Sequence, residues 1–176
     1  MTHGVLEKVS QIRSRRRIDA ERGSDNLCVY FINERIQAVE PDFPFEFIIR
    51  GTPVSLQRHN SVAKQTWKEL VRAAGRAVLP DMHFATSDPL SVTLFYYPEG
   101  RMVGDIDNVI KLTLDAMSQL VYVDDRQVER VLMQKFENGR IFSFQKPSET
   151  LAACMLGPKP ALYIRVSKDP HEELRG

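Results

Sequence analysis

The residues best suited to chemistry lie in one acidic stretch near the middle of the chain. Five aspartates and no glutamate fall within residues 105–125. Aspartate is a poor former of helix interiors, so packing alone would not place it there so often. Carboxylate oxygens are preferred ligands of Mg²⁺ and Mn²⁺, whereas the four histidines are too scattered to indicate zinc. The stretch therefore indicates a site for a hard divalent ion.

The spacing of the first two aspartates limits how they can share a ligand. Residues two apart share a face in extended chain, but they point about 200° apart in a helix. A common site therefore requires Asp105 in extended chain and Asp107 at a helix start, where the helix dipole favours a carboxylate. Lys111 lies one turn further along the same face, so it can reach this site.

A purely structural interpretation explains the same residues without chemistry. Asp105 or Asp107 can cap the helix, Asp107 can pair with Lys111, and Asp124–Asp125 can form a turn. For Asp115, a local ion pair with Lys111 is the favoured interpretation, although the Lys-then-Asp order is the weaker one. Spacing alone leaves the functional and structural interpretations open.

The combined pattern resembles the RusA family of Holliday junction resolvases. It reads D-x-D-N-x-x-K-x-x-x-D-A, followed about ten residues later by D-D-x-Q-V. In this sequence the positions are Asp105, Asp107, Asn108, Lys111, Asp115 and Ala116, then Asp124, Asp125, Gln127 and Val128. The resemblance covers residues 45–136 and extends to the segment 161–166.

The resemblance implies an activity and a set of site residues. It implies a homodimer that cuts four-way DNA junctions with Mg²⁺ or Mn²⁺, in DNA recombination and repair. The family's three essential acidic positions, which hold the metal, map onto Asp105, Asp107 and Asp125, and its catalytic lysine maps onto Lys111. Asn108 and Asp124 are assisting positions.

Three departures from the family pattern bear on the substrate. Residues 1–44 have no counterpart in compact members, and about twenty residues (141–160) are inserted before the last strand. The basic run before the first aspartate is reduced to Arg101. Two alternatives therefore stay open: a broader structure-selective nuclease with the same site, and a junction-binding protein that does not cut.

Hydrophobic periodicity predicts the elements that must position these residues. We expect a strand at 45–49, a helix from Asn60 or Ser61 to Pro80, and a strand at 90–97. A helix from about 107 to 119, a strand at 127–136 and a hairpin return at 141–144 should follow. A short helix at 148–155 and a strand at 161–166 complete the pattern. The predicted class is α+β, with a small mixed sheet packed by two main helices.

The predicted organisation is a single RusA-like domain with short additions. Residues 45–168 form this domain, residues 1–44 are an N-terminal extension, and residues 169–176 are a charged tail. Whether Asp125 meets Asp107 in one chain stays open, because the return from the helix must be nearly straight or the helix must end early. Otherwise two subunits share the site.

Basic residues on the second predicted element suggest a DNA-binding surface. Their spacing of four places them on one helical face, and Arg101 adds a further contact. The set is Lys64, Lys68, Arg72, Arg76 and Arg101. A solvated helix face is the alternative. The arginines between positions 13 and 17 allow a basic arm or an unstructured tail.

Composition and the lack of a targeting signal limit the partners and the location that the sequence supports. The net charge is +1, so total charge identifies no partner. The first ten residues lack the hydrophobic core of a signal peptide, and Cys28 and Cys154 make no disulfide framework. We therefore expect a cytoplasmic protein with buried thiols, no membrane contact and no nucleotide cofactor. Trp67 is expected in the core.

Overall fold

A computed structural model describes residues 38–54, 60–102, 105–139 and 142–171. The arginine cluster at 13–17 and Cys28 lie outside this part of the chain. The strands are β1 (Phe45–Arg50), β2 (Leu90–Tyr97), β3 (Val128–Lys135) and β4 (Ala161–Ser167). The helices are α2 (Ser61–Arg76), α3 (Ile106–Met117) and α4 (Glu149–Leu156), with the short 3₁₀ helix η1 (Asp125–Gln127).

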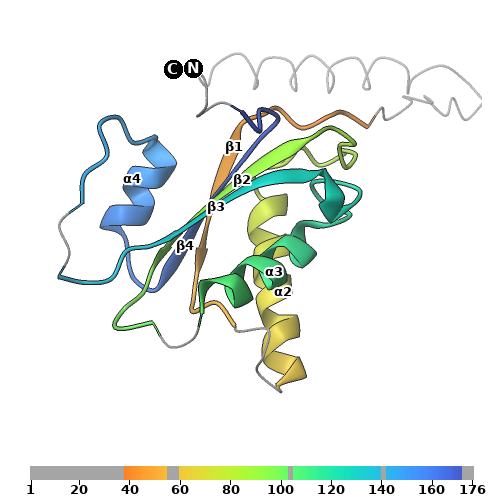
Figure 1. The fold of residues 1–176 in the computed structure, drawn as a ribbon. Helices are drawn as coiled ribbons and strands as arrows, with labels where there is room; N and C mark the ends of the chain where they lie inside the picture. Colours follow the sequence, from red (N-terminus) through yellow and green to blue (C-terminus); the bar gives the residue numbers. More distant parts are fainter. Residues whose placement is uncertain (1–37, 55–59, 103–104, 140–141, 172–176) are drawn as a thin grey trace, which may run out of the picture. The chain divides into compact units, whose positions relative to one another are not determined.

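The four strands form one mixed sheet in the order β1-β4-β2-β3 (Figure 1). The pairs β1–β4 and β4–β2 are antiparallel, whereas β2 and β3 run parallel. A parallel pair needs a crossover connection, and α3 lies in the crossover between β2 and β3. This mixed sheet with its helices confirms the predicted α+β class.

The helices α2 and α3 cover one face of the sheet. Leu94 and Ile164 from this face are fully buried with Trp67 of α2 and Leu112 of α3. The Asn60 side chain caps α2 by accepting a hydrogen bond from the Ala63 N–H. Trp67 lies in the core as predicted, and its indole N–H donates to Thr113 Oγ1 at 3.3 Å.

Two apolar residues are exposed although their helical spacing would place them on the same face as Trp67. Leu70 has 43% of its surface accessible and Val78 has 46%. Val71, the next residue along α2, is fully buried. Val78 lies beyond the last helical residue, Arg76, so the helical spacing no longer determines its direction.

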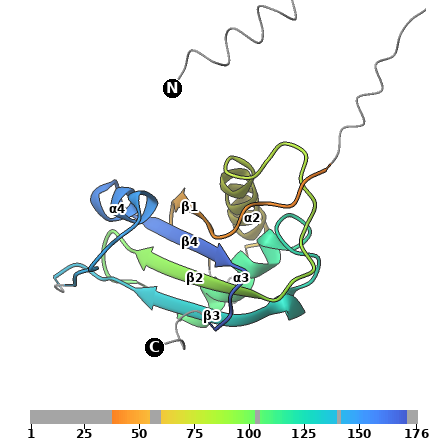
Figure 2. The ribbon, with the colours of Figure 1, turned by 90° about the horizontal axis from the view of Figure 1, so that it is seen from above.

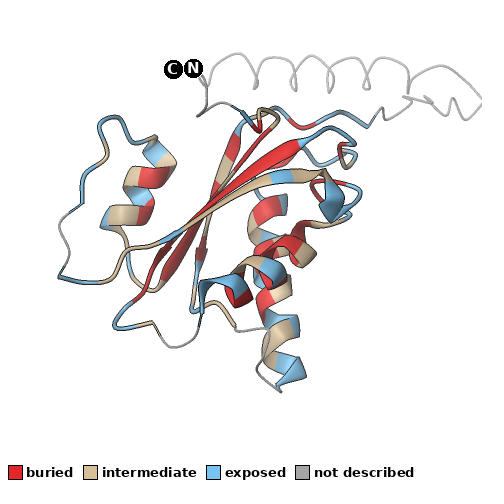
Figure 3. Ribbon diagram, viewed as in Figure 1, coloured by how far each residue is buried: buried red, intermediate tan, exposed pale blue. Residues whose placement is uncertain are grey.

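The helix α4 packs on the opposite face of the sheet: in Figure 1 the sheet lies between α4 and the pair α2 and α3, and Figure 2 gives the view from above. Its residues Leu151 and Cys154 are buried against Tyr97 and Tyr163. The predicted cap is confirmed, because Ser148 accepts a hydrogen bond from the Leu151 N–H. Figure 3 shows buried positions along the central strands and on the inner sides of the helices.

The predicted return strand at 141–144 is wrong for the residues that are described. Residues 142–144 have no strand pairing. Phe142 and Phe144 instead contact Phe136 through their rings. Aromatic packing therefore holds this segment without a backbone ladder.

Residues 38–44, placed by the sequence in the extension, contact the folded unit. Val39 forms a β-bridge with His83, and Phe43 packs against the main core. Glu40 accepts a hydrogen bond from Thr86 Oγ1 at 2.9 Å and pairs with Lys168. Among the residues described, no helix has the length and apolarity needed to cross a membrane.

Candidate active site

The beginning of α3 presents two exposed carboxylates. Asp105 occupies the N-cap position in extended conformation, with φ −95° and ψ 150°, and Asp107 lies in the first helical turn. This is the arrangement that the spacing required for a shared site. Within the described chain, the Asp105 side chain makes no capping hydrogen bond, so helix capping does not explain this residue.

Asn108 supports the carboxylate beside it. Its side chain is 5% exposed, and its Nδ2 donates a hydrogen bond to Asp107 Oδ1 at 3.3 Å. Asn108 is therefore placed to orient Asp107 from the buried side of the helix.

Lys111 joins α3 to the second half of the acidic motif. Its Nζ lies 2.7 Å from Asp125 Oδ2 and 2.9 Å from Asp115 Oδ1. The hydrogen bonds to Asp125 and Asp115 raise the pKa of Lys111 above its ordinary value. The bond from Lys111 likewise lowers the pKa of Asp125. At neutral pH the site therefore contains a fixed ammonium group between two carboxylates.

The return from α3 explains how Asp125 reaches Lys111 within one chain. The helix ends at Met117, two residues earlier than the sequence suggested, and Gln119 adopts a left-handed conformation with φ 63°. The Gln119 N–H donates to Tyr122 O at 2.7 Å, and the buried Tyr122 hydroxyl donates to Leu114 O at 2.7 Å. These contacts reverse the chain beside the helix.

Asp124 has a structural role in presenting Asp125. It caps η1 by accepting a hydrogen bond from the Arg126 N–H at 2.9 Å, and its own backbone N–H donates to Gln127 Oε1 at 2.9 Å. Gln127 also donates to Thr86 O and Asp88 O. The turn interpretation thus holds for Asp124. Gln127 belongs to the acidic motif, but its anchoring role depends on contacts with residues distant in sequence.

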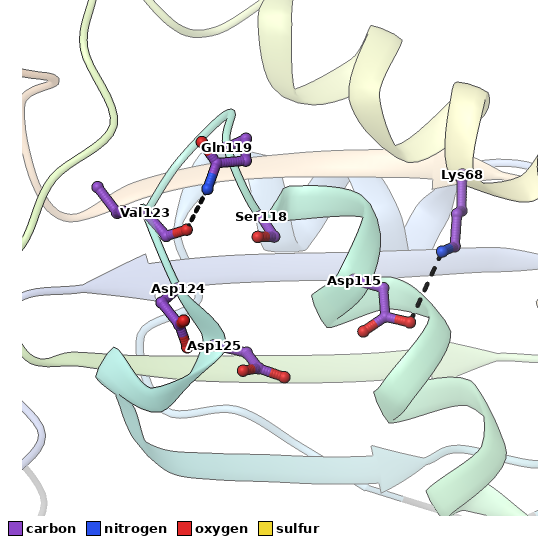
Figure 4. A pocket seen from close by; sticks show the side chains of 7 residues that line it. All are labelled: Lys68, Asp115, Ser118, Gln119, Val123, Asp124 and Asp125. Carbon is purple, nitrogen blue, oxygen red and sulfur yellow. Dashed lines mark hydrogen bonds and ion pairs between the residues drawn. The ribbon is translucent and has the colours of Figure 1, made fainter.

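An open pocket of about 370 Å³ lies next to this network (Figure 4). It is formed by α2, the end of α3 and the return segment, which is the stretch 119–125 that follows α3. Its lining residues are Lys68, Asp115, Ser118, Gln119, Val123, Asp124 and Asp125. The pocket is polar and borders the Asp125 end of the site, so it offers space for a charged ligand.

The donor set has the right chemistry for a hard divalent ion. Asp105, Asp107 and Asp125 supply only carboxylate oxygens, the donors that Mg²⁺ and Mn²⁺ prefer. Across the described residues, no three histidine, cysteine or acidic side chains gather into a metal-binding group. Asp105, Asp107 and Asp125, which are all described, are therefore not gathered into one such group in this structure. Mg²⁺ is usually held by one or two carboxylates together with water and substrate phosphate.

The basic side chains of α2 divide into two groups. Lys68 Nζ lies 3.6 Å from Asp115 Oδ2, and Arg72 donates to Ser118 O at 3.3 Å. Both therefore contact α3 and its C-terminal end. Arg76 and Arg101 are exposed and Lys64 is half-buried.

Comparison with known proteins identifies the family. The family model described as Endodeoxyribonuclease RusA matches residues 51–142, which is more than half of the chain. The chain belongs to the RusA family. The match spans the whole acidic motif, from Asp105 to Asp125, and ends before α4 and β4. The comparison with curated proteins found no match.

The RusA family assignment confirms the predicted activity. The protein is an endodeoxyribonuclease that resolves Holliday junctions, with a role in DNA recombination and repair. RusA nucleases generally depend on a metal, and their substrate is branched DNA.

Proposed function

We propose that this RusA protein cuts the phosphodiester backbone with Asp105, Asp107, Lys111 and Asp125. The contact that supports the proposal is the 2.7 Å pair between Lys111 and Asp125. It connects the two separate halves of the acidic motif on one side of α3. Asp105 and Asp107 lie at the start of the same helix. Asn108 and Asp124 assist by orienting their acidic neighbours.

Asp105, Asp107 and Asp125 would hold Mg²⁺, or Mn²⁺ in its place. Such an ion supplies Lewis-acid stabilisation of the phosphate and a lowered pKa for water. Lys111 contributes a compact positive charge toward the anionic phosphate. In the hydrolysis, the oxygen of water forms a new bond to phosphorus while one bond from phosphorus to a sugar oxygen breaks. One proton of the water ends on the departing sugar oxygen, and the other stays on the new phosphate monoester or passes to solvent.

Resolution of a four-way junction requires two symmetric cuts. Two equivalent active sites supply these cuts most simply in a C2 homodimer, the commonest form of soluble oligomer. We therefore propose that the protein acts as a homodimer, in which the pairing also decides whether residues from both subunits complete each site. Sedimentation of the full chain checks this, and a monomer that cuts junctions in two places contradicts it.

The α2 side chains and Arg101 are proposed to follow the DNA backbone. Phosphate contacts position a protein on DNA and dominate its affinity. Lys64, Arg76 and Arg101 belong to this surface. Lys68 and Arg72 belong to it as well, although their contacts to α3 hold them closer to the pocket.

The decisive experiment compares the full chain with Asp107→Asn on synthetic DNA. The substrates are a four-way junction, a flap, a fork, a duplex and a single strand, each with Mg²⁺, Mn²⁺ or chelator. The variant should remain folded and cut the junction about a hundredfold or more slowly, as when one group that stabilises transition-state charge is removed. Near-normal cutting by Asp107→Asn contradicts the site assignment. Equal cutting of flaps and junctions contradicts junction selectivity.

A further inference from the structure

We propose that Asp115, braced by Lys68 of α2, is a positioning residue that holds the Lys111 ammonium in the active site. The inference rests on the proposed catalytic role of Lys111. It assigns a role to an acidic residue that is neither a proposed metal ligand nor a proposed catalytic group.

The two oxygens of Asp115 each contact a different lysine. Oδ1 lies 2.9 Å from Lys111 Nζ on the same helix, and Oδ2 lies 3.6 Å from Lys68 Nζ on α2. With the Lys111–Asp125 contact, this forms a line of alternating charges from α2 across α3 to η1. Figure 4 shows the Lys68–Asp115 part of this line at the wall of the pocket.

Local helix energetics do not explain an aspartate at position 115. It lies in the last turn of α3, where the helix dipole disfavours a negative charge. The Lys-then-Asp order at positions i and i+4 is also the less favourable one. The 2.9 Å contact with Lys111 is local to α3, whereas the 3.6 Å contact with Lys68 is tertiary, so Asp115 also serves the arrangement between the helices.

The position of Lys111 shows why a second carboxylate is useful. Its ammonium is shared between Asp125, a proposed metal ligand, and Asp115, which is not one. If Asp125 binds a cation other than Lys111, Asp115 still holds the Lys111 ammonium near the site. Lys68 in turn keeps the Asp115 side chain turned toward Lys111 and not toward solvent.

The test uses Asp115→Asn in the full chain. Its single-turnover cleavage of a four-way junction should fall about tenfold to a hundredfold, as small misplacements of catalytic groups do. Its junction affinity, measured with chelator present, should not change. Glu69→Gln is the matched control, because it removes a charge next to Lys68 on α2 from a residue whose hydrogen bond is to Gln65. Cleavage by Asp115→Asn at the rate of the control overturns the proposal.

A double-mutant cycle separates positioning from a general loss of negative charge. In the Lys111→Met background, Asp115→Asn should cause no further loss, because the group that it positions is absent. An equal loss in both backgrounds overturns the proposal. Wild-type cleavage by Lys111→Met itself overturns the proposed function, so the two failures are distinguishable.

If the variants cleave too slowly to be compared, the position of Lys111 can be measured directly, without metal, DNA or turnover. NMR of the protein labelled at lysine side chains should show the Lys111 resonance shifted and more mobile in Asp115→Asn. The Lys159 resonance should not move, since its Nζ donates to Met155 O at the end of α4. An unchanged Lys111 resonance overturns the proposal.

Lys68→Met tests the brace itself. A fall in the single-turnover cleavage rate at saturating protein, where any loss of junction affinity no longer matters, supports the bracing role. A loss of junction affinity with an unchanged rate shows a phosphate contact only, and it overturns the role of Lys68 in the proposal.

Discussion

The Tyr122 hydroxyl donates a hydrogen bond of 2.7 Å to the backbone carbonyl of Leu114, eight residues earlier in the chain. Tyr122 is fully buried, and burial raises the pKa of its hydroxyl well above the ordinary value. The group is therefore a neutral donor at all working pH values. Its bond ties the return segment to α3 and so sets where Asp125 meets Lys111.

Removal of this hydroxyl should affect both stability and cleavage. Tyr122→Phe removes one of two hydrogen bonds to the Leu114 carbonyl, which keeps the bond from the Ser118 N–H at 3.1 Å. The expected loss is therefore that of one net hydrogen bond, about 0.5–1.5 kcal/mol of unfolding free energy. Urea unfolding measures this loss. Junction cleavage should fall more than the stability loss explains, because Asp125 is less well placed. A variant that is destabilised but fully active would show that the return segment does not depend on this bond.

Gln127→Met should weaken the anchor of η1. The variant loses the reciprocal capping bond to Asp124 and the bonds to Thr86 O and Asp88 O. We expect slower cleavage with little change in junction binding, because Gln127 positions Asp125 and does not contact DNA in this proposal. Ser148→Ala, which removes a cap on the opposite face, should lose about 1 kcal/mol of stability without a specific loss of cleavage rate.

Glu40 should make the free energy of unfolding depend on pH in the acidic range. Its hydrogen bonds from Lys168 and then Thr86 lower its pKa in the folded chain below the ordinary value. A lowered folded pKa gives stability that is present above the unfolded pKa and is lost as pH falls through the folded pKa. Urea unfolding between neutral and acidic pH should therefore show a smaller decline in Glu40→Gln than in wild type. Parallel curves for the two proteins would contradict this contribution.

Lys64 and Arg76, the first and last basic residues on the basic face of α2, should contribute to salt-dependent DNA binding. Each lost phosphate contact lowers the slope of log affinity against log salt by about 0.9. Lys64→Ala with Arg76→Ala should therefore reduce this slope by roughly 2 on a four-way junction. Lys146→Ala is the control, because this exposed lysine precedes α4 on the other side of the sheet. An unchanged slope in the double variant excludes this face of α2 from the DNA surface.

Strictly periodic segments could be predicted from the sequence, and their bounds agree closely with the structure. The alternation from Leu90 to Tyr97 coincides with β2, and Asn60 caps α2 as expected. The helical spacing of the apolar residues includes Leu70, which the structure leaves exposed. The segment at 142–144 was wrongly assigned because its apolar residues pack as aromatic rings and not as a ladder.

The candidate site was predictable in its residues but not in its contacts. The positions of Asp105 and Asp107 followed from helix geometry, and the structure has Asp105 extended as required. The meeting of Lys111 with Asp125 depends on a non-glycine residue, Gln119, in a left-handed conformation. Such a conformation is uncommon for glutamine, so no local rule predicts the reversal. The catalytic roles themselves stay predictions.

The parallel pairing of β2 and β3 has an evolutionary consequence. All four proposed catalytic residues lie between the start of β2 and the start of β3, inside one strand–helix–strand unit. Segments outside this unit, such as residues 142–160, can change in length without interrupting the stretch of chain that carries the proposed catalytic residues. Related proteins can therefore differ outside the β2–α3–β3 unit and still keep the proposed catalytic residues together.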